Sequence, residues 1–397
     1  MDKIRPYSGV RILDMCHDLG SYATKLFADL GAEVIRVEPP DGLPDRRRVA
    51  AEAKETQDRY ELSSFEFKNS NKKSISIDFD DDGGLATFSQ LAATAQIIIL
   101  ETSGPLYDRI DFVKETAPRS VITVVSPFGM DKPVGEFQSS NDLILQAAGG
   151  IAYLSGRQED SPLSLPQGQV GMVASVYAAS ATAIALADLE QRNRGHVVDV
   201  SAQECIAHSL QNAIQVWDLE KKISTRGGVG TKDASEDIFE CSDGYVFLAS
   251  PPTLGVSWKS LIAWMREQEA PEAEEFAKER WLDRGWRLTE EAHRLFRRHF
   301  EPFSRRQSKQ TLLDEAIKRK IVMSPVAKVA DLFDDAQLRH REFFRAVSYD
   351  ASGVTARAPG APYKLSVEVW TISQAPQLGA HTGDIEALLT NGSEAKG

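Results

Sequence analysis

The stretch Val10-Arg-Ile-Leu-Asp-Met-Cys-His-Asp-Leu-Gly-Ser-Tyr-Ala-Thr-Lys-Leu-Phe-Ala-Asp-Leu-Gly-Ala-Glu-Val-Ile-Arg-Val-Glu38 decides the fold. Its two ends, Val10–Met15 and Glu33–Glu38, are short runs typical of strands, and Tyr22–Gly31 between them has helical spacing. A connection this short between strands that read as parallel requires a right-handed crossover. The stretch therefore predicts one strand–helix–strand unit of a parallel sheet.

The same alternation continues along the chain. Further strands are predicted at Ser74–Phe79, Gln96–Glu101, Ser120–Ser126 and His196–Val200, with a helix over Gly83–Ala95. The run Ile97–Leu100 shows no alternation of polar and apolar residues, which is typical of strands covered on both faces. We therefore predict an α/β fold with a parallel sheet.

Composition changes in the second half of the chain. Asn141–Arg192 reads as helical, and Ser224–Asp243 is polar and contains Arg226-Gly-Gly-Val-Gly230, which predicts a mobile loop between domains. Trp258 to about Lys320 is charged and helical, and the chain becomes loop-rich after Pro325. This contrast predicts a second, smaller domain.

Charge and composition exclude several classes of function. Lys and Arg number 46 against 58 for Asp and Glu, and the net charge of −12 repels nucleic acid and anionic lipid. No uninterrupted apolar run approaches the roughly 20 residues of a membrane span, and Met1–Tyr7 lacks the apolar core of a signal peptide. Cys16, Cys205 and Cys241 form no pair typical of a disulfide framework or a thiolate metal site. We expect a cytoplasmic protein with no nucleic-acid or membrane partner.

Motifs for several cofactors are missing. A dinucleotide enzyme carries G-x-G-x-x-G in the turn after its first strand, whereas Cys16-His-Asp-Leu-Gly-Ser21 has a single glycine. G-x-x-x-x-G-K-[ST], H-E-x-x-H and G-x-S-x-G are also absent. The seven histidines have no ligand spacing, and packing or surface roles are expected for them, including His17 at its strand end. We expect no metal, nicotinamide or flavin.

Two cationic segments could meet an anionic ligand in this acidic chain. In Lys68-Asn-Ser-Asn-Lys-Lys73 the lysines supply charge and the asparagine amides supply hydrogen-bond donors, although a solvated loop has the same composition. Arg46-Arg-Arg48 could serve in the same way, and a surface charge run is the role we expect for it.

Several segments, in one order and spacing, resemble a known family. Asn69-Ser-Asn-Lys-Lys-Ser-Ile75 resembles a CoA-contacting loop, Gln146-Ala-Ala-Gly-Gly150 a helix, and Arg192–Ser201 a strand segment of the class III CoA-transferases, also called the CaiB/BaiF family. The other matching segments are Gly9–Asp14, Tyr22–Thr24, Ala28–Pro40, Ser242–Val246, Asp334–Phe344 and Leu378–Thr382. The resemblance runs from about residue 9 to residue 386.

The resemblance implies a fold and an activity. It implies a Rossmann-like large domain from residues 1–222 and 326–397, a linker loop and smaller α+β domain over 223–325, and an interlocked dimer. It also implies transfer of CoA from an acyl-CoA donor, with succinyl-CoA as a candidate, to a carboxylic acid. In this chemistry an aspartate attacks the donor thioester and forms a mixed anhydride, which is nucleophilic catalysis by a carboxylate.

The family's aspartate is absent from this chain. Its position, at the start of the long helix, holds Gly171, and the nearby Gln167 and Gln169 are amides that cannot form an acyl anhydride. Asp142 is a weak alternative. Racemase relatives need a histidine–aspartate pair at 141–142 and an acid at 171, and Asn141 and Gly171 break that pattern.

The remaining expectations concern the ligand and the partner. CoA or acyl-CoA is the expected substrate, and the residues assigned to it by resemblance are Asp18, Leu19, Lys68, Asn69, Ser70, Asn71, Lys72, Lys73, Thr102, Ser103, Arg109, Asn141 and Asp142. The leading hypothesis is a subunit paired with a paralogue that keeps the aspartate. The alternatives are a homodimeric enzyme of altered CoA chemistry using Asp142, Asp233 or Glu236, and a non-enzymatic protein that binds CoA thioesters.

Overall fold

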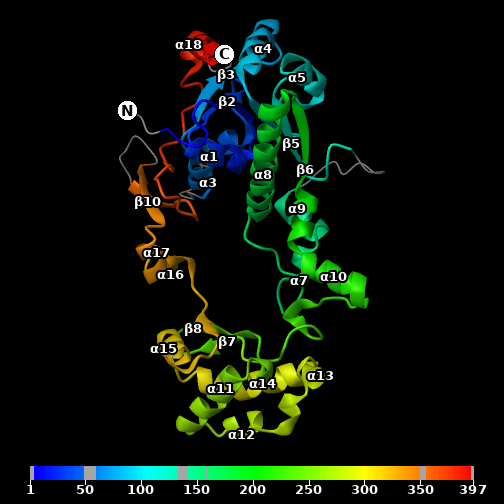
Figure 1. Ribbon diagram of the computed structural model, residues 1–397, viewed down its shortest axis with the longest axis vertical. Coiled ribbons are helices and arrows are strands. Elements are labelled where there is room, and N and C mark those ends of the chain that lie inside the picture. Colours follow the sequence, from blue (N-terminus) through cyan, green and yellow to red (C-terminus); the bar gives the residue numbers. More distant parts are fainter. Residues whose placement is uncertain (1–3, 49–59, 132–140, 158, 349–354, 395–397) are drawn as a thin grey trace. The chain divides into compact units, whose positions relative to one another are not determined.

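The computed structural model describes residues 4–48, 60–131, 141–157, 159–348 and 355–394 (Figure 1). The chain divides into one unit of residues 1–150, 165–209 and 336–397, and a second of residues 151–164 and 210–335. The sequence predicts boundaries at 222/223 and 325/326, whereas the structure divides the chain at 209/210 and 335/336. Residues 151–164 join the second unit because the Arg226 guanidinium donates to the carbonyls of Tyr153 and Arg157.

The first unit is built on a six-stranded parallel sheet in the order β3-β2-β1-β4-β5-β6. Its strands are β1 (Arg11–Met15), β2 (Glu33–Glu38), β3 (Lys73–Ser76), β4 (Ile97–Glu101), β5 (Val121–Ser126) and β6 (His196–Ser201), with a separate hairpin of β10 (Phe344–Ser348) and β11 (Thr355–Pro359). Its helices are α1 (Ser21–Asp29), α3 (Tyr60–Asn69), α4 (Asp82–Thr94), η1 (Tyr107–Arg109), α5 (Ile110–Thr116), α6 (Asp142–Ala148), α8 (Gln169–Arg192), α9 (Ala202–Ser209), α17 (Ala336–His340), η5 (Thr382–Asp384) and α18 (Ile385–Glu394). The predicted parallel sheet is confirmed.

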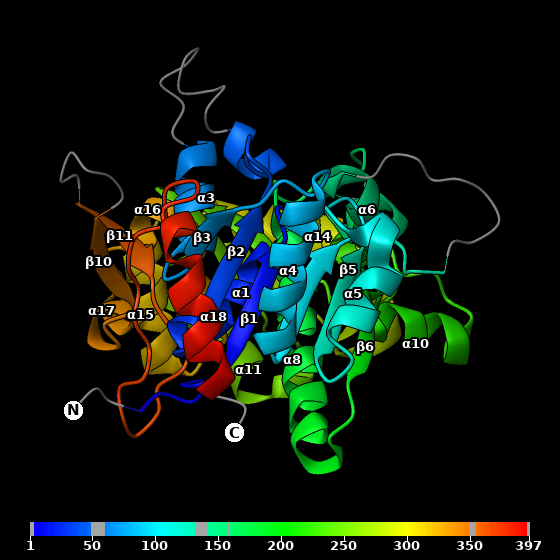
Figure 2. The same cartoon turned by 90° about the horizontal axis from the view of Figure 1, so that it is seen from above.

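Helices cover both faces of this sheet. Helices α4, α5 and α18 lie on one face and α1 and α8 on the other (Figure 2). Every residue of β1, β4 and β5 is buried, which explains why Ile97–Leu100 of β4 reads as a continuous apolar run. Between β1 and β4 the strand order reverses, and ligands of open α/β sheets bind at the carboxyl ends of strands at such a point.

Helix α8 is the one helix in the described ranges that is long and apolar enough to cross a membrane. Half of its apolar window is buried inside the structure, and it packs against α1, β5, β6 and α9. Polar residues such as Ser175, Ser180 and Thr182 interrupt its sequence, so α8 is not an uninterrupted apolar run, and its packing is that of a core helix.

The C-terminal segment returns to the edge of the parallel sheet. The backbone N–H of Ser74 donates to His381, and that of Ser76 donates to Thr382. The guanidinium of Arg11, on β1, donates to the carbonyl of Leu388 on α18 at 2.6 Å. The two ends of the chain are thus joined within one unit.

The second unit has its own antiparallel sheet, in the order β7-β8-β9. Its strands are β7 (Asp237–Cys241), β8 (Gly244–Leu248) and β9 (Met323–Pro325), and its helices are α7 (Ile151–Leu154), α10 (Gln211–Glu220), η2 (Arg226–Gly228), η3 (Pro252–Leu254), α11 (Val256–Glu267), α12 (Ala273–Phe276), η4 (Glu279–Leu282), α13 (Arg284–Arg287), α14 (Glu290–Ser304), α15 (Lys309–Arg319) and α16 (Val329–Leu332). The prediction of a loop over Ser224–Asp243 is wrong for β7, because Phe239 and Cys241 alternate into an aromatic core with Phe296 and Phe300.

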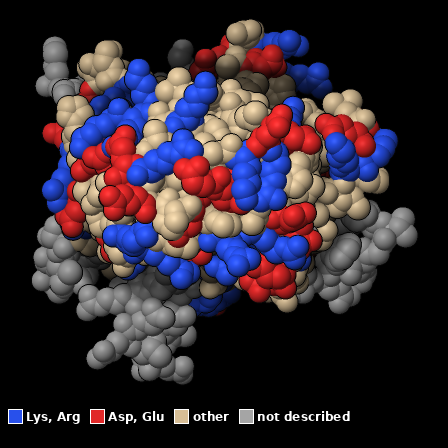
Figure 3. Space-filling view, turned by 90° about the horizontal axis from the view of Figure 1, so that it is seen from below, with Lys and Arg blue, Asp and Glu red and all other residues tan. Residues whose placement is uncertain are grey.

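The surface of this second unit carries both signs of charge. On the face in Figure 3, Lys and Arg lie side by side with Asp and Glu. Ion pairs such as the exposed Arg266–Glu274 and the partly exposed Arg319–Glu267 join neighbouring elements. Such pairs contribute about 0–1 kcal/mol each to stability, so this pattern serves solubility more than folding.

Candidate active site

A cavity of about 580 Å³ lies at the carboxyl ends of β1 and β4, within the first unit. Its walls come from the turn between β1 and α1, from α3, from the end of β4 and from the first turns of α6 and α8. The lining residues are His17, Asp18, Leu19, Asp45, Arg48, Ser64, Phe65, Lys68, Glu101, Ser103, Pro127, Asn141, Asp142, Leu145, Gln167, Gly168 and Gly171. The cavity therefore occupies the position that the reversal of strand order predicts for a ligand.

The turn after β1 is organised by one buried carboxylate. Oε1 of Glu101, the last residue of β4, accepts hydrogen bonds from the backbone N–H groups of His17, Asp18 and Gly20 at 3.1, 2.9 and 2.8 Å. Glu101 is fully buried, and burial raises its pKa while the nearby His17 lowers it. One side chain thus satisfies three backbone donors and shapes the wall of the cavity.

His17 is held between three polar groups. Its Nδ1 lies 3.1 Å from Asp18, and its Nε2 lies 3.1 Å from the Ser103 hydroxyl and 3.5 Å from Glu101. Burial alone lowers the pKa of His17, but the charges of Glu101 and Asp18 outweigh it and raise the pKa to about 9. The ring is therefore protonated at neutral pH and donates hydrogen bonds, so it is not poised to act as a base toward Ser103.

Asp18 remains ionised beside this imidazolium. Partial burial raises its pKa, but His17 and Arg48 outweigh that effect and hold the pKa well below its usual range. The Arg48 guanidinium donates to Asp18 at 2.6 Å. The floor of the cavity thus contains alternating positive and negative groups.

Gly171 lies where no side chain fits. It is in the first turn of α8, and a Cβ built on it would lie 2.8 Å from the Asp18 carbonyl oxygen and 3.8 Å from the Leu19 Cα. Optimal contacts between such atoms are about 3.5–4.0 Å. Helix α8 cannot easily move away, because the Ser175 hydroxyl donates to the Leu19 carbonyl at 2.6 Å. The backbone of the β1–α1 turn therefore occupies the space of a side chain at position 171.

We expect Gly171→Asp to lower the free energy of unfolding by about 1–3 kcal/mol, as overpacking does elsewhere. The Asp18–Leu19 backbone must shift to admit the new Cβ, so the variant should also gain no acyl adduct. Gly383→Asp is the matched control, because a Cβ at Gly383 has nothing within 4 Å. Urea unfolding measures both, and equal midpoints for the two variants would contradict the steric argument.

The two polar residues at the start of α6 serve as helix caps. The Asn141 side chain accepts from the N–H of Ile144 at 2.9 Å. One oxygen of Asp142 accepts from the N–H of Val170 at 3.0 Å, and the other accepts from the Gln146 amide. Both oxygens of Asp142 are engaged in tying α6 to α8, which weakens the case for Asp142 as a nucleophile.

The predicted cationic loop is mostly turned away from the cavity. Lys72 is buried and donates to Asp14 at 2.8 Å, to the Ser21 carbonyl and to Asn69. The side-chain amide oxygen of Asn69 also accepts from the buried Arg36. These groups hold β1, β2 and the end of α3 together.

The other predicted ligand residues are distributed as follows. Asp18, Leu19, Lys68, Ser103, Asn141 and Asp142 line the cavity, whereas Asn69, Ser70, Asn71, Lys72, Lys73, Thr102 and Arg109 do not. Lys73 pairs with Glu33, and Asn71 donates to Asp29 and to the Thr371 carbonyl. Arg109 is exposed and donates to the Phe79 carbonyl.

Sequence reasoning passed over three contributors to this site. His17 was expected to have a packing or surface role, Glu101 was not assigned to the site, and Arg48 was placed in a surface charge run, although it donates to Asp18. The expectation of a surface role is also wrong for Arg46, whose guanidinium forms an ion pair with the buried Glu38 at 2.7 Å. The position of His17 and Glu101 in the sequence could have indicated their role. Each lies at the carboxyl end of one of the two strands, β1 and β4, between which the strand order reverses.

Within the described ranges, no group of three or more His, Cys, Asp or Glu side chains is arranged to hold a metal ion. The cavity contains one imidazolium, two further cationic side chains and several carboxylates at the end of a parallel sheet.

Fold and site together define a doubly wound α/β protein whose ligand cavity lies at the strand-order reversal. The model of CoA-transferase family III matches residues 7–382. The chain therefore belongs to CoA-transferase family III, which confirms the resemblance found in the sequence.

Curated relatives and solved structures agree with this assignment. The chain is 34% identical over 388 residues to the succinyl-CoA:(R)-benzylsuccinate CoA-transferase subunit BbsE of Thauera aromatica, covering 96% of this chain and 93% of that protein. It is 26% identical over 405 residues to a succinyl-CoA–L-malate CoA-transferase alpha subunit of Chloroflexus aurantiacus, covering 98% and 91%. The crystal structure of a CaiB/BaiF family protein from Brucella suis shares the fold, with a TM-score of 0.78 at 22% identity over 98% of this chain and 100% of that one.

Proposed function

We propose that this chain is a non-catalytic subunit of a class III CoA-transferase, paired with a paralogous chain that carries the nucleophilic aspartate. The observation that carries the proposal is Gly171. The family position for the nucleophile has no carboxyl group, and the Asp18 carbonyl lies 2.8 Å from where a Cβ would stand. The site is thus built around the glycine.

The other carboxylates considered as substitutes are in structural use. Asp142 caps α8 and binds Gln146 with its second oxygen. Asp233 is buried in the second unit, where it accepts from Arg287 at 2.5 Å and from Ser235. Glu236 also belongs to the second unit and does not line the cavity. These roles favour the subunit hypothesis over a homodimeric enzyme of altered chemistry.

The cavity keeps features that suit a CoA thioester. Its 580 Å³ is within the range of small-molecule sites, about 300–1,000 Å³. Lys68 and Arg48 line it, and cationic side chains bind phosphate with charge-assisted hydrogen bonds. We propose CoA and acyl-CoA as its ligands, with no metal, nicotinamide or flavin.

Exposed apolar side chains support an obligate partner. Helix α10 buries none of its residues, yet it carries Ile214, Trp217 and Leu219, which are 51%, 52% and 80% exposed. Helix α8 exposes Ile184 in the same way. Apolar patches of this kind mark protein–protein interfaces. We propose that they are covered in an interlocked dimer of the kind implied by the family, with a Rossmann-like large domain in each subunit.

The relatives suggest the donor. The names of the Thauera and Chloroflexus proteins both specify succinyl-CoA and both denote subunits. We propose succinyl-CoA as the donor and a carboxylic acid of the benzylsuccinate type as the acceptor, in a cytoplasmic enzyme. The test of the subunit assignment is chemical and uses this chain alone.

We expect the isolated chain to form no covalent acyl or CoA adduct, because anhydride formation requires a carboxylate at position 171. After incubation with succinyl-CoA and then hydroxylamine, its intact mass should be unchanged. A family member with the aspartate, treated in parallel, should show the hydroxamate. A stoichiometric adduct on any Asp or Glu of this chain would remove the basis of the proposal.

We expect Lys68→Ala to weaken CoA binding at least about tenfold, since a charge-assisted hydrogen bond contributes about 1.5–3 kcal/mol. Lys73→Ala is the matched control from the same loop, because Lys73 pairs with Glu33 and does not line the cavity. Calorimetry on both variants measures the difference. An effect of Lys73→Ala as large as that of Lys68→Ala would show that the whole loop contacts CoA, as the sequence predicts.

A further inference from the structure

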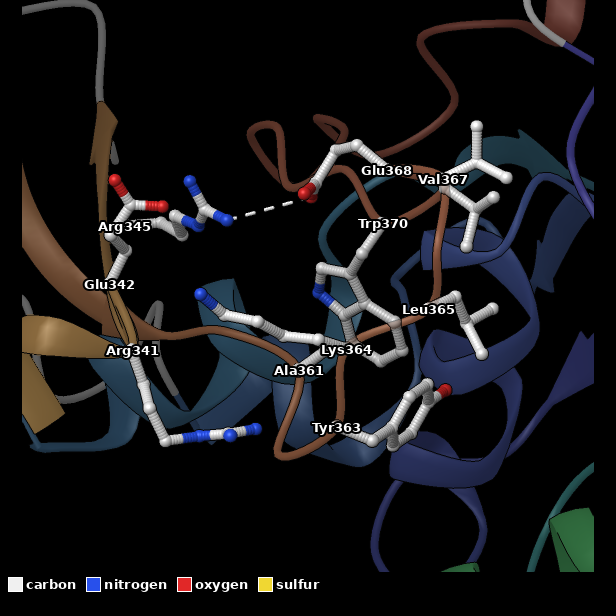
Figure 4. A pocket seen from close by; sticks show the side chains of 11 residues that line it. Arg341, Glu342, Arg345, Ala361, Tyr363, Lys364, Leu365, Val367, Glu368 and Trp370 are labelled. Atoms are coloured by element: carbon white, nitrogen blue, oxygen red, sulfur yellow. Dashed lines mark ion pairs between the residues drawn. The ribbon is translucent and has the colours of Figure 1, made fainter. Parts of the chain in front are cut away.

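A second, smaller cavity lies in the first unit, between the start of the hairpin and the segment that follows it (Figure 4). Its volume is about 80 Å³, and its walls come from residues 341–345 and 361–370. None of these residues lines the cavity at β1 and β4. The family motifs quoted above reach only its edge, at Arg341 and Glu342, and they assign no role to it.

The cavity is rich in cationic side chains. Arg341, Arg345 and Lys364 line it together with the carboxylates Glu342 and Glu368, which leaves a net charge of +1. This excess stands out in a chain whose net charge is −12. Among the residues that the structure describes, no carboxylate lies within ion-pairing distance of Arg341 or Lys364.

Among the described residues Arg345 pairs with one carboxylate, Glu368, and the contact is long. Its Nη2 lies 3.5 Å from Oε1 of Glu368, and both side chains are substantially exposed. Figure 4 shows this pair at one end of the cavity, with the Lys364 ammonium beside it. A pair of this length and exposure is weak, and a stronger anion can replace Glu368.

Trp370 supplies a donor that lacks an acceptor. Its indole Nε1 is buried, and no hydrogen-bond partner is present among the described residues. The nitrogen lies on the edge of the ring that faces Lys364 and Arg345 (Figure 4). Tyr363 packs edge-on against the ring at 5.8 Å and helps to fix its orientation. Buried donors are almost always satisfied in folded proteins, so this one points to a missing acceptor.

We propose that this cavity binds a small tetrahedral oxyanion, either free phosphate or a phosphoryl group of a larger ligand. The indole N–H donates to one oxygen, and Arg341, Arg345 and Lys364 supply the positive charge and further donors. A volume of about 80 Å³ is that of two or three water molecules, which admits one phosphoryl group and excludes a nucleoside. The proposal is independent of the function assigned to the larger cavity.

The indole N–H of Trp370 allows a direct test by NMR. The chain has six tryptophans, and the signal of Trp370 is identified as the one lost in Trp370→Phe. Titration with inorganic phosphate should shift this signal, whereas chloride at equal ionic strength should not. The second arm of the experiment compares CoA with dephospho-CoA. If CoA shifts the signal but dephospho-CoA and inorganic phosphate do not, the bound phosphoryl group belongs to a larger ligand. If inorganic phosphate shifts the signal, the ligand is the free ion.

Substitutions of opposite sign separate binding from a structural role. Lys364→Met removes the charge and keeps the aliphatic stem, and it should weaken phosphate binding at least fivefold. Glu368→Gln frees Arg345 and should strengthen binding about threefold, while Lys259→Met, at an exposed lysine of the second unit, should change nothing. The proposal would be overturned if neither phosphate nor CoA shifted the Trp370 signal, or if chloride shifted it equally. It would also be overturned if all three variants lost the same affinity for phosphate.

Discussion

Coexpression of this chain with a paralogue that has an aspartate at the position of Gly171 is expected to yield a one-to-one heterodimer with CoA-transferase activity. The activity should fall to background when this chain is expressed alone or when the partner's aspartate is replaced by alanine. The reason is that a dimer of this chain has no nucleophile in either site, whereas the mixed dimer has one. Native mass spectrometry and a succinyl-CoA transfer assay measure composition and activity together.

This first prediction also has a physical basis in solubility. Obligate interfaces bury more than about 2,000 Å² and are more apolar than transient ones. The exposed Trp217 and Leu219 on α10 would remain in water in a monomer. Two separate homodimers after coexpression, or turnover of acyl-CoA by this chain alone, would contradict the pairing.

Replacement of Glu101 is expected to have the largest effect on stability. Glu101→Ala leaves the N–H groups of His17, Asp18 and Gly20 without their acceptor, and those of His17 and Gly20 are buried. Each unsatisfied donor costs about 1–3 kcal/mol, and partial access of water reduces the sum, so we expect a loss of about 3–5 kcal/mol. Urea unfolding followed by circular dichroism measures it, and a loss below about 1 kcal/mol would contradict the role given to Glu101.

Glu101→Gln separates the hydrogen bonds from the charge. Its amide oxygen can take the place of Oε1 and keep the three backbone donors satisfied, but the negative charge near His17 is lost. The pKa of His17, about 9 in the native protein, should then fall toward its ordinary value of 6.5. A ¹H–¹⁵N titration of the imidazole measures this shift, and an unchanged His17 pKa would show that Asp18 alone raises it.

The raised pKa of His17 also sets how its own contribution to stability depends on pH. The folded state binds the proton more tightly than the unfolded chain, so the stabilisation is complete below about pH 6.5 and is lost as the pH rises through about 9. In Glu101→Gln this loss should begin at a lower pH. A carboxylate with a lowered pKa behaves in the opposite way, because its contribution to stability is lost as the pH falls.

The parallel sheet was predictable because its central strands β1, β4 and β5 are buried on both faces. Runs such as Ile97–Leu100 have no polar positions to confuse them with loops, and the predicted and observed limits of β2 coincide at Glu33–Glu38. β7 was missed because only Phe239 and Cys241 of its five residues are buried, and the flanking glycines and charges are typical of a loop. Short, half-exposed strands carry a weak signal in a single sequence.

The candidate site was predictable in place but less so in detail. The end of β1 and position 171 were both recognised, because topology and the family motif fix them. The orientation of the Lys72 side chain could not be predicted. No pattern in Lys68–Lys73 reveals that Asp14 and the Ser21 carbonyl accept hydrogen bonds from its ammonium group. Tertiary packing determines which acceptors lie within hydrogen-bonding distance of a lysine side chain.

The hydrogen bond between Arg11 and Leu388 has a consequence for how the protein is made. These residues are 377 positions apart, so a ribosome working at about 5–20 residues per second needs about 20–75 s to supply the second after the first. During that interval the second unit, whose core lies within residues 234–323, can complete its folding. The edge of β3 still lacks its hydrogen-bond acceptors on His381 and Thr382, which have not yet been synthesised. The newborn large unit therefore passes through a period with an unfinished sheet edge, when chaperone protection matters most.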